Sequence, residues 1–418
     1  MSDKVKYLDY FYEDWFLDYA SYVILERAVP KQEDGLKPVQ RRILHSMFEM
    51  HDNRFHKVAN IIGHTMQYHP HGDASIGDAL VNLTHRSLLI ETQGNFGDIR
   101  TGDRAAAPRY IEAKLSNFAI DVAFNHRLTE YQDSYDGRNK EPVQLPMKFP
   151  LLLLNGTEGI AVGLSTKILP HNFNELIKAS ISILNNKSFK IFPDFQTGGS
   201  IDVDNYKKGK KGGKVRIRST IEIIEKDKLT IKSVPYSSNT TSLIDSIIKA
   251  NDNGKIKIKN IEDNTAEEVD IAITLPKGIS PTQTIDALYL FTQCEISISP
   301  NCCVIKNNAP IFSNVNDLLI DSTYKTQKSL QNELELQKSD LDRKWHLLSL
   351  EKIFIEHKIY RLIEDAESWS IVVDIIMNAL LPFESKLKTK ISNDDIIYLT
   401  DLKIKRISKY DINKTKDK

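Results

Sequence analysis

The residues best suited to chemistry are Arg109 and Tyr110, which follow three alanines and a proline in the segment Ala105–Glu112. A phenol has a reference pKa of about 10, so it is a weak nucleophile at neutral pH unless a cation stabilises the charge that develops in the transition state. The guanidinium of Arg109 can supply that cation. The pair predicts a tyrosyl nucleophile that attacks phosphorus, and the alternative is an inert surface tyrosine behind a turn.

Four further motifs surround this pair in a fixed order. They are Gly35–Leu44, Tyr68–Asp73, Gln93–Gly97 and Asn155–Gly163. Several motifs in one order are far more specific than any one of them. Together with Tyr110 they resemble the DNA breakage-reunion subunit of bacterial type IIA topoisomerases, the family of the gyrase A and topoisomerase IV A subunits. The resemblance runs from about Tyr7 to about Tyr410.

The resemblance implies a reversible transesterification. Tyr110 would attack a DNA phosphodiester, form a 5′-phosphotyrosyl link and release a 3′-hydroxyl that later reverses the reaction. Arg109 would stabilise the charge of the pentavalent phosphoryl group, since phosphoryl transfer depends on positioning and electrostatics more than on covalent help. The same step on the opposite strand would open a double-strand gate for a second duplex, as relaxation, decatenation and chromosome segregation require.

The resemblance also implies a set of DNA-contacting residues near the scissile phosphate. The residues that match family positions are Lys37, His69 and His71. The residues expected to extend the phosphate contact are Arg27, Arg41 and Arg42. Gln40 stands where gyrase-like members often have His, which favours topoisomerase IV over gyrase.

Hydrophobic periodicity predicts two short helices, Val58–Met66 and Asp73–Arg86, with Asp73 as the N-cap of the second. A helix, a tight Pro/Gly turn and a helix form a helix-turn-helix arrangement. Its second helix would lie in or against a DNA groove and present Ser75 and Asp78 near its N-terminus, where backbone N–H groups also favour phosphate. A plain helical hairpin is the alternative.

This second helix departs from gyrase-like members in two respects. The order Ala74-Ser75 is reversed, and Gly77 stands where an aromatic residue is frequent. These positions are associated in the family with quinolone binding, so drug sensitivity stays open.

Ile160 is a candidate for a different kind of DNA contact. Asn155-Gly156 predicts a tight hairpin turn, and Ile160 follows on the emerging strand. In the resembled family the Ile at this place wedges between base pairs and bends the duplex, which exchanges unstacking for extra contact. The alternative is an ordinary core residue.

These elements belong to an expected α+β multidomain architecture. The expected parts are a helical arm at 1–30, a winged-helix DNA-gate domain with the catalytic Tyr at 31–148, an α/β tower domain at 149–320, and a coiled coil with a partial C-gate at 321–418. Apolar residues spaced along 8–26 predict an amphipathic helix. It packs on the partner subunit in the family, and burial against its own domain is the alternative. Strands are predicted at Lys214–Ile217, Leu229–Val234 and Val269–Thr274.

A long helical region follows, because there is no glycine after Gly278 and no proline from Ser313 to Leu381. The heptad-like spacing of a coiled-coil seam is carried by Leu341, Trp345, Leu348, Ile355, Ile359 and Leu362. Ile397–Ile407 resembles the dimerising gate. The family's return helix and DNA-wrapping domain do not follow it, so we expect a truncated chain or an incomplete gene.

Composition sets only wide limits. The 418 residues carry 56 Lys plus Arg and 56 Asp plus Glu, so net charge says nothing about nucleic acid. Cys294, Cys302 and Cys303 contain no CxxC pair, which favours reduced structural thiols. Acids interrupt the N-terminus, and no apolar run reaches about 18 residues, which excludes a signal peptide and a membrane-spanning segment. We expect a cytoplasmic, nucleoid-associated bacterial protein.

The expected partners are double-stranded DNA, a second copy of this chain and a topoisomerase B subunit, in an A₂B₂ assembly. No GxxxxGK[ST] loop is present, so ATP hydrolysis and Mg²⁺ are expected on the B subunit, with no metal on this chain.

Three alternatives compete with this assignment. A metallohydrolase site at His69-x-His71-x-Asp73 is disfavoured because no His follows the Asp, and Asp202-x-Asp204 lacks the acidic neighbours of a Mg²⁺ site. A non-enzymatic winged-helix DNA-binding protein, inactive through truncation, is the remaining alternative.

Seven cations in Lys207–Arg218 form either a solvated loop or a phosphate contact.

Overall fold

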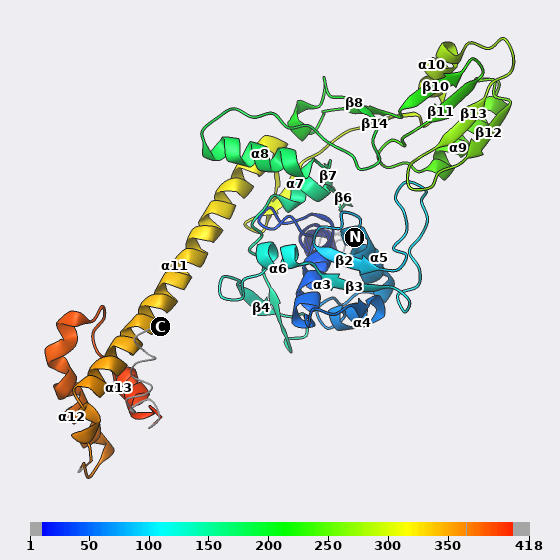
Figure 1. Cartoon of the computed structure of the whole chain (residues 1–418). Coiled ribbons are helices and arrows are strands. Elements are labelled where there is room, and N and C mark those ends of the chain that lie inside the picture. Colours follow the sequence, from blue (N-terminus) through cyan, green and yellow to red (C-terminus); the bar gives the residue numbers. More distant parts are fainter. Residues whose placement is uncertain (1–10, 365, 404–418) are drawn as a thin grey trace. The chain divides into compact units, whose positions relative to one another are not determined.

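The computed structural model describes residues 11–364 and 366–403, and it mixes helices with several small sheets, as the α+β prediction requires (Figure 1). Contacts divide the chain into two compact units, Met1–Ser329 and Leu330–Lys418. Helix α11 (Val315–Glu356) runs across the boundary between the units. The predicted domain boundaries at 30, 148 and 320 stay predictions. No described helix combines the length and the apolar character that crossing a membrane requires.

The described chain begins with a helical stretch made of η1 (Phe11–Phe16), α2 (Leu17–Val23) and η2 (Ile24–Ala28). Ala20 and Val23 are buried. The large apolar and aromatic side chains that this stretch leaves exposed are Tyr12, Trp15, Phe16, Leu17, Tyr19 and Tyr22. The predicted helix is confirmed from residue 11 onward, and its expected start at residue 8 lies outside the described residues.

Three helices and a three-stranded antiparallel sheet follow, with strand order β1-β3-β2. These elements are α3 (Pro38–Glu49), β1 (His56–Lys57), α4 (Val58–Thr65), α5 (Asp73–Thr84), β2 (Ile90–Gln93) and β3 (Glu112–Leu115). Pro38 occupies the first turn of α3, and the Gln40 side chain accepts a hydrogen bond from the Lys37 N–H (3.0 Å), so the motif opens with its own N-terminal cap.

The predicted helix pair is confirmed as α4 and α5, but the predicted cap is wrong. Gly72 is the N-cap of α5, and Asp73 is already helical. The Asp73 carboxylate accepts from the N–H of Ala74 (2.9 Å), and the Ser75 hydroxyl donates to the Gly72 carbonyl (2.6 Å). The cap falls one residue earlier because Gly72 takes the extended backbone that precedes a helix (φ −58°, ψ 145°).

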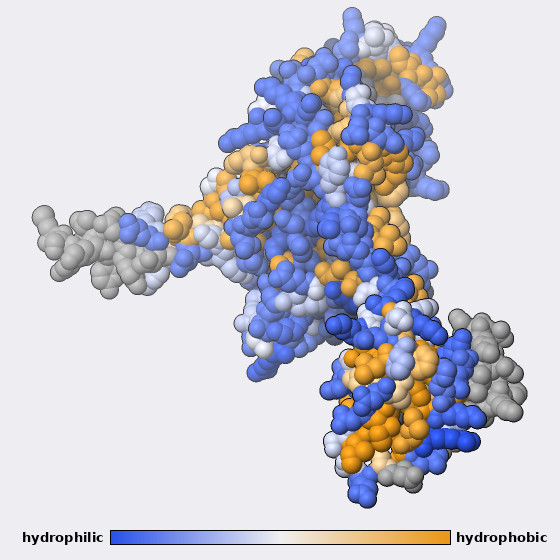
Figure 2. Space-filling view, turned by 90° about the vertical axis from the view of Figure 1, so that its left-hand side faces the viewer, coloured by the Kyte–Doolittle hydropathy of each residue, from blue (hydrophilic) through white to orange (hydrophobic). Residues whose placement is uncertain are grey.

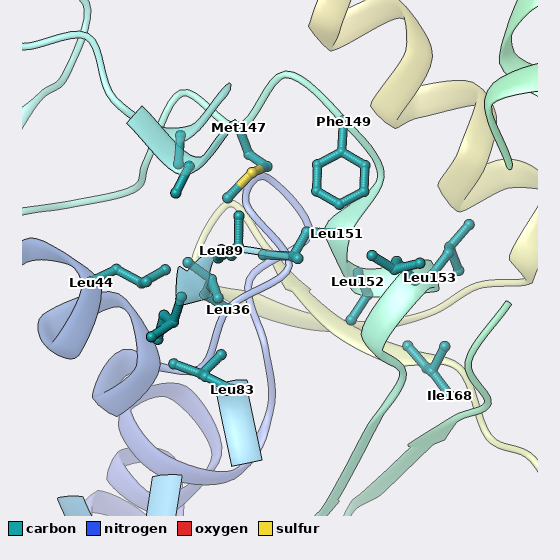
Figure 3. Packing of buried hydrophobic residues seen from close by; sticks show 14 of the residues in the cluster. Leu36, Leu44, Leu83, Leu89, Met147, Phe149, Leu151, Leu152, Leu153 and Ile168 are labelled. Atoms are coloured by element: carbon teal, nitrogen blue, oxygen red, sulfur yellow. The ribbon is translucent and has the colours of Figure 1, made fainter. Parts of the chain in front are cut away.

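One apolar cluster joins these helices to the chain that follows (Figure 3). Leu44 of α3 and Leu83 of α5 lie in it together with Leu151 of the short helix α7 (Leu151–Asn155). Gly35 marks the closest approach, because a Cβ there would lie 2.7 Å from the Leu152 backbone nitrogen at a φ of +73°. A larger residue at position 35 would push α7 away from α3.

Two hairpins and three helices complete the middle of the chain. They are α6 (Asn117–Ala123), β4 (Tyr131–Asp133), β5 (Lys140–Pro142), α7, β6 (Thr157–Ile160), β7 (Ser165–Ile168) and α8 (Phe173–Leu184). The prediction for Asn155-Gly156 is wrong, because Asn155 ends α7 and Gly156 is its C-cap with φ +66°. The hairpin turn lies instead after Ile160, which ends β6 opposite Ser165 of β7.

The predicted β-rich region is confirmed as two sheets of order β14-β9-β8 and β10-β11-β13-β12, plus the hairpin β15-β16. Their strands are β8 (Ser200–Asp202), β9 (Val215–Arg218), β10 (Ile221–Glu225), β11 (Lys228–Ile231), β12 (Asn260–Asp263), β13 (Ile271–Thr274), β14 (Glu295–Ile298), β15 (Cys303–Lys306) and β16 (Ala309–Phe312). A short 3-10 turn, η3 (Lys207–Gly209), precedes β9, and α9 (Thr240–Asp252) and α10 (Pro281–Phe291) pack with the four-stranded sheet in a separate apolar cluster.

The second unit holds the end of α11 and the segments η4 (Ile359–Arg361), α12 (Trp369–Leu380), η5 (Leu381–Lys386) and α13 (Asn393–Thr400). Its core cluster includes Leu350 and Phe354 of α11, whereas Leu341 and Trp345 are 65% and 43% exposed. Figure 2 shows apolar surface over this unit.

The long helix is confirmed, but the predicted seam is wrong beyond Ile355. α11 ends at Glu356 and Lys358 takes the left-handed conformation, so Ile359 and Leu362 do not continue its face. The expected gate segment is described only as far as residue 403, and its remainder lies outside the described residues.

Candidate functional site

Arg109 and Tyr110 lie together at an exposed turn just before strand β3. The Tyr110 side chain is 64% exposed, and the Arg109 guanidinium carbon lies 4.6 Å from the centroid of its ring. The Tyr110 N–H donates to the Ala107 carbonyl (2.9 Å), which closes the turn. The phenol is thus reachable by a large substrate and already has a cation beside it, which is the arrangement that the sequence predicted.

The turn is held by backbone hydrogen bonds to the Gln93–Gly97 motif and to the start of helix α4. The Ala106 N–H donates to the Asn95 carbonyl (2.9 Å), and the Ala59 N–H at the start of α4 donates to the Pro108 carbonyl (3.1 Å). Gly97 is required here, because a Cβ at its φ of +80° would lie 2.5 Å from the Asp103 carbonyl oxygen. The Gln93–Gly97 motif therefore supports the tyrosine turn through the backbone rather than through chemistry of its own.

Arg41 is not the phosphate contact that the sequence predicted. Its side chain is 6% exposed and makes a two-point ion pair with the fully buried Asp34, with Nε–Oδ2 and Nη2–Oδ1 distances of 2.6 and 3.1 Å. The Leu36 carbonyl accepts a third hydrogen bond from Nη2 (3.0 Å). The adjacent acid raises the pKa of Arg41 despite its burial. Arg41 faces inward because α3 directs this position toward the loop that precedes the helix.

Arg42 is also largely covered, with a side chain 11% exposed. Its guanidinium pairs with Glu141 through Nε–Oε2 (2.5 Å) and Nη2–Oε1 (2.9 Å), and its Nη1 lies 3.1 Å from His69 Nδ1. Burial and the Arg42 charge lower the pKa of His69 to about 4, so His69 is neutral at pH 7. Arg42 thus stands behind His69 rather than at the surface, contrary to its predicted direct contact with phosphate.

His71, Lys37 and Arg27 keep more exposure. The Tyr22 hydroxyl is 2.7 Å from His71 Nε2, and burial together with Arg27 lowers the pKa of His71. Lys37 Nζ donates to the Glu158 carbonyl (2.6 Å), and burial lowers the Lys37 pKa. Arg27 is exposed. One ring nitrogen of each histidine has a side-chain partner: His69 Nδ1 faces Arg42, and His71 Nε2 faces Tyr22.

The first turn of α5 presents a polar surface beside the tyrosine turn. Ala74, Ser75 and Asp78 are exposed, as predicted. An open cleft of about 850 Å³ is lined by residues of α4, α5 and the chain leading to Tyr110. Gly77 is one of its lining residues, and a Cβ there would lie 3.2 Å from the Ile62 side chain. The first turns of α5 therefore open onto free space.

Ile160 is 82% exposed, so the alternative that it is a core residue is wrong. It sits at the end of β6, whose neighbour Gly159 packs so tightly against the Ala28 carbonyl that no Cβ would fit. Lys37 bonds the carbonyl of Glu158 on the same strand. An isolated aliphatic side chain on a firmly held hairpin is the geometry that a wedge between base pairs needs.

The remaining residues that the sequence singled out make contacts within the protein. Arg216 pairs with Asp202 (2.6 Å) and Arg218 with Glu295 (2.5 Å), so part of the basic segment is neutralised, and Asp202 serves as an ion-pair partner. The described residues include no group of three or more His, Cys, Asp or Glu that could hold a metal ion. The cysteines are free and buried, and burial raises the pKa of Cys294 to about 11.

Sequence reasoning missed the residues that hold the site from behind. Asp34, Glu141 and the carbonyl of Glu158 fix Arg41, Arg42 and Lys37 respectively. Glu141 is 99 residues from Arg42, so no local pattern could have indicated the pair. Asp34 is seven residues from Arg41, but it lies before the helix begins, where helical spacing does not apply.

Comparison with known proteins gives a consistent result. Residues 27–418 match the family model for the A subunit of DNA gyrase/topoisomerase IV. The chain is 47% identical over 402 residues to the A subunit of DNA topoisomerase 4 from Borreliella burgdorferi, covering 96% of this chain and 64% of the relative. It is 34% identical to the DNA gyrase A subunit of Lawsonia intracellularis and 36% identical to that of Metamycoplasma arthritidis. Those matches cover 89% and 84% of this chain but only 47% and 42% of the relatives.

Proposed function

This chain belongs to the family of DNA gyrase and topoisomerase IV A subunits, and from that premise we propose that it is the DNA breakage-reunion subunit of an ATP-dependent type IIA topoisomerase. The observation that carries the proposal is the Arg109–Tyr110 turn. A 64% exposed phenol with a guanidinium 4.6 Å from its ring centroid suits attack on a phosphodiester of a bulky duplex. Relaxation and decatenation of DNA are the reactions that this subunit would serve.

The proposed step is a balanced exchange of esters. The Tyr110 oxygen loses its proton and bonds to phosphorus, and the bond from phosphorus to the 3′ oxygen breaks. The 3′ oxygen takes up a proton and leaves as a hydroxyl, while the 5′ phosphate stays on Tyr110. Arg109 stabilises the extra negative charge on the phosphoryl oxygens. The reverse attack by the 3′-hydroxyl reseals the strand without any outside energy.

The DNA contacts that we propose lie around this turn, and all but the 6% exposed His69 keep intermediate or full exposure. The proposed set is Lys37, His69, His71, Arg27, Ser75, Asp78 and the wedge Ile160. Exposure of Ser75, Asp78 and Ile160 supports their assignment. Neutral His69 would donate a hydrogen bond rather than supply a charge. Most of the long-range attraction to phosphate would then come from Arg27, Lys37 and Arg109.

The finer architecture is proposed from the family. Helices α3 to α5 with the sheet β1-β3-β2 would form a winged-helix DNA gate, the sheets of 200–312 a tower, and α11 part of a coiled coil that leads to a dimerising gate. The proposed partners are double-stranded DNA, a second copy of this chain and a B subunit, in an A₂B₂ assembly. The B subunit would hold Mg²⁺, which supplies Lewis-acid help to phosphoryl transfer, and would hydrolyse ATP. The nucleoid would be its place of action.

A covalent-trapping assay tests the proposal. The chain is mixed with its cognate B subunit, Mg²⁺ and supercoiled plasmid, and the reaction is quenched with detergent. Protein-linked 5′ ends that disappear with Tyr110→Phe are the expected result. DNA binding without an adduct would contradict the transesterase and favour a DNA-binding protein without enzymatic activity.

A further inference from the structure

A chain of polar side-chain contacts runs from the hairpin β4-β5 to the surface of the proposed DNA gate. Gln132 and Glu141 are cross-strand partners in that hairpin, and the Gln132 amide donates to Glu141 Oε1 (3.2 Å). Glu141 holds Arg42 of α3 at two points, and Arg42 reaches His69 Nδ1. The side chains of Glu141 and Arg42 are only 5% and 11% exposed, so this contact is shielded from solvent.

The chemistry of the last contact determines the proton position on His69. A guanidinium has N–H donors and no acceptor, so the His69 Nδ1 that lies 3.1 Å from Arg42 Nη1 must present its lone pair. A neutral imidazole with an unprotonated Nδ1 carries its proton on Nε2. Protonation of Nδ1 would place two donors and two positive charges against each other.

His69 is only 6% exposed, and its second ring nitrogen, Nε2, is the one that can act on a bound molecule. Within the described part of the chain, Nε2 of His69 has no hydrogen-bond partner. It is not one of the atoms that are both unpaired and cut off from solvent. The neighbouring His71 ring lies 4.7 Å away between centroids and is engaged by Tyr22. The charged and titratable groups around His69 are Arg42, His71, Glu141 and Arg27.

We propose that Glu141, acting through Arg42, holds His69 as a neutral ring that donates its Nε2–H to a phosphate oxygen of the bound DNA. Glu141 and Arg42 are then positioning residues, and His69 is the group that touches the substrate. The inference rests on the proposed function for the identity of that substrate. It explains why a buried ion pair lies directly behind a DNA-contacting histidine, and it assigns a role to the β4-β5 hairpin.

The proton position can be measured without any DNA. The full chain is labelled with ¹⁵N-histidine, and the His69 signals are assigned by their loss in His69→Gln. We expect an unprotonated Nδ1 and a protonated Nε2 from about pH 8 to about pH 5.5, a range in which an ordinary histidine titrates. Glu141 raises the pKa of His69 and Arg42 lowers it more strongly, so the test is the double variant Arg42→Gln, Glu141→Gln: there the fixed tautomer should be lost and His69 should titrate closer to the ordinary value.

Glu130→Gln is the matched control, because Glu130 is exposed, precedes the same hairpin and undergoes the same change of charge. Glu141→Gln leaves Arg42 buried without its acid and can fail to fold. The double variant Arg42→Gln, Glu141→Gln removes both charges together, so it leaves no buried charge unpaired. An ordinary titration of His69 in the native chain, the opposite tautomer, or a variant indistinguishable from Glu130→Gln would each overturn the inference.

The covalent-trapping assay supplies the functional readout. Glu141→Gln should lower the adduct about tenfold relative to Glu130→Gln, the size of one lost hydrogen bond to a charged group. In the double variant Arg42→Gln, Glu141→Gln, the ratio of variant to native adduct should rise as the pH falls from about 8 to about 5.5, because a protonated His69 donates from Nε2 without help from Arg42. A purely structural loss would leave that ratio constant and would overturn the inference. A native chain that forms no adduct would instead overturn the proposed function, while the proton position is judged by the spectra alone.

Discussion

The two arginine sites of the N-terminal unit look alike in sequence but lie in opposite environments. Arg109 stands beside Tyr110 at an exposed turn, whereas the Arg41–Arg42 pair of α3 is covered and bound to acids. At the first site the cation is available to a substrate. At the second, the cations hold the protein together and act on a substrate only through a neighbour. A basic motif in this sequence therefore does not say which of its cations face solvent and which are paired with buried acids.

The largest expected effect is on stability and concerns Arg41, the buried arginine. Arg41→Ala should lower the free energy of unfolding by about 3–5 kcal/mol, because it leaves the fully buried Asp34 charged and unpaired. Chemical unfolding followed by circular dichroism measures this. The double variant Asp34→Asn, Arg41→Ala should recover part of the loss. A change below about 1 kcal/mol would mean that Arg41 is not a structural residue.

Substitution of Arg109, the exposed arginine, should lower the activity and leave the stability unchanged. Arg109→Ala should reduce the covalent adduct about 10²–10³-fold, as expected when one group that stabilises transition-state charge is removed. Its unfolding free energy should stay within about 0.5 kcal/mol of the native value. Arg109→Lys should restore part of the adduct, since it keeps the charge but not the planar fork. Equal adduct yields from all three proteins would remove Arg109 from the mechanism.

Ile160 extends the same contrast to an apolar residue. Ile160→Ala should leave stability unchanged, because the side chain is 82% exposed, but it should reduce the bent fraction of bound duplex and lower the adduct about tenfold. Energy transfer between dyes at the ends of a duplex reports the bend. Ile181→Ala, at a 54% exposed position on α8, is the matched control and should bend DNA as the native chain does.

The last prediction concerns pH. Because the pKa of His69 is held near 4 in the folded chain and is about 6.5 when unfolded, the unfolded chain binds the proton more readily between these values. Stability should therefore fall as the pH drops from about 6.5 toward 4. The buried His171, whose pKa is also lowered to about 4, adds to the same slope. Unfolding midpoints at several pH values should show a shallower slope for His69→Gln, and an unchanged slope would contradict the neutral state of His69.

Much of the local structure was predictable because it depends on neighbours in sequence. The helix pair α4–α5, the three predicted strands and the long helix α11 follow from periodicity and from the absence of Gly and Pro. The errors occur at ends and junctions. Gly72 rather than Asp73 provides the cap of α5, Asn155-Gly156 closes a helix instead of a hairpin, and the seam stops where Lys358 turns left-handed. At such places a few backbone angles decide the outcome, and contacts from elsewhere set those angles.

By itself, the sequence determined the order of the motifs, the family and the candidate nucleophile, because residue types and their local spacing carry that information. Only the tertiary structure decided that Tyr110 and Ile160 are exposed, that Arg41 is buried and that Arg42 stands behind His69. Exposure and ion pairing depend on acids such as Asp34 and Glu141, which approach these positions only when the chain folds. The residue type determines which side chains are charged, but their solvation and their partners depend on the folded chain.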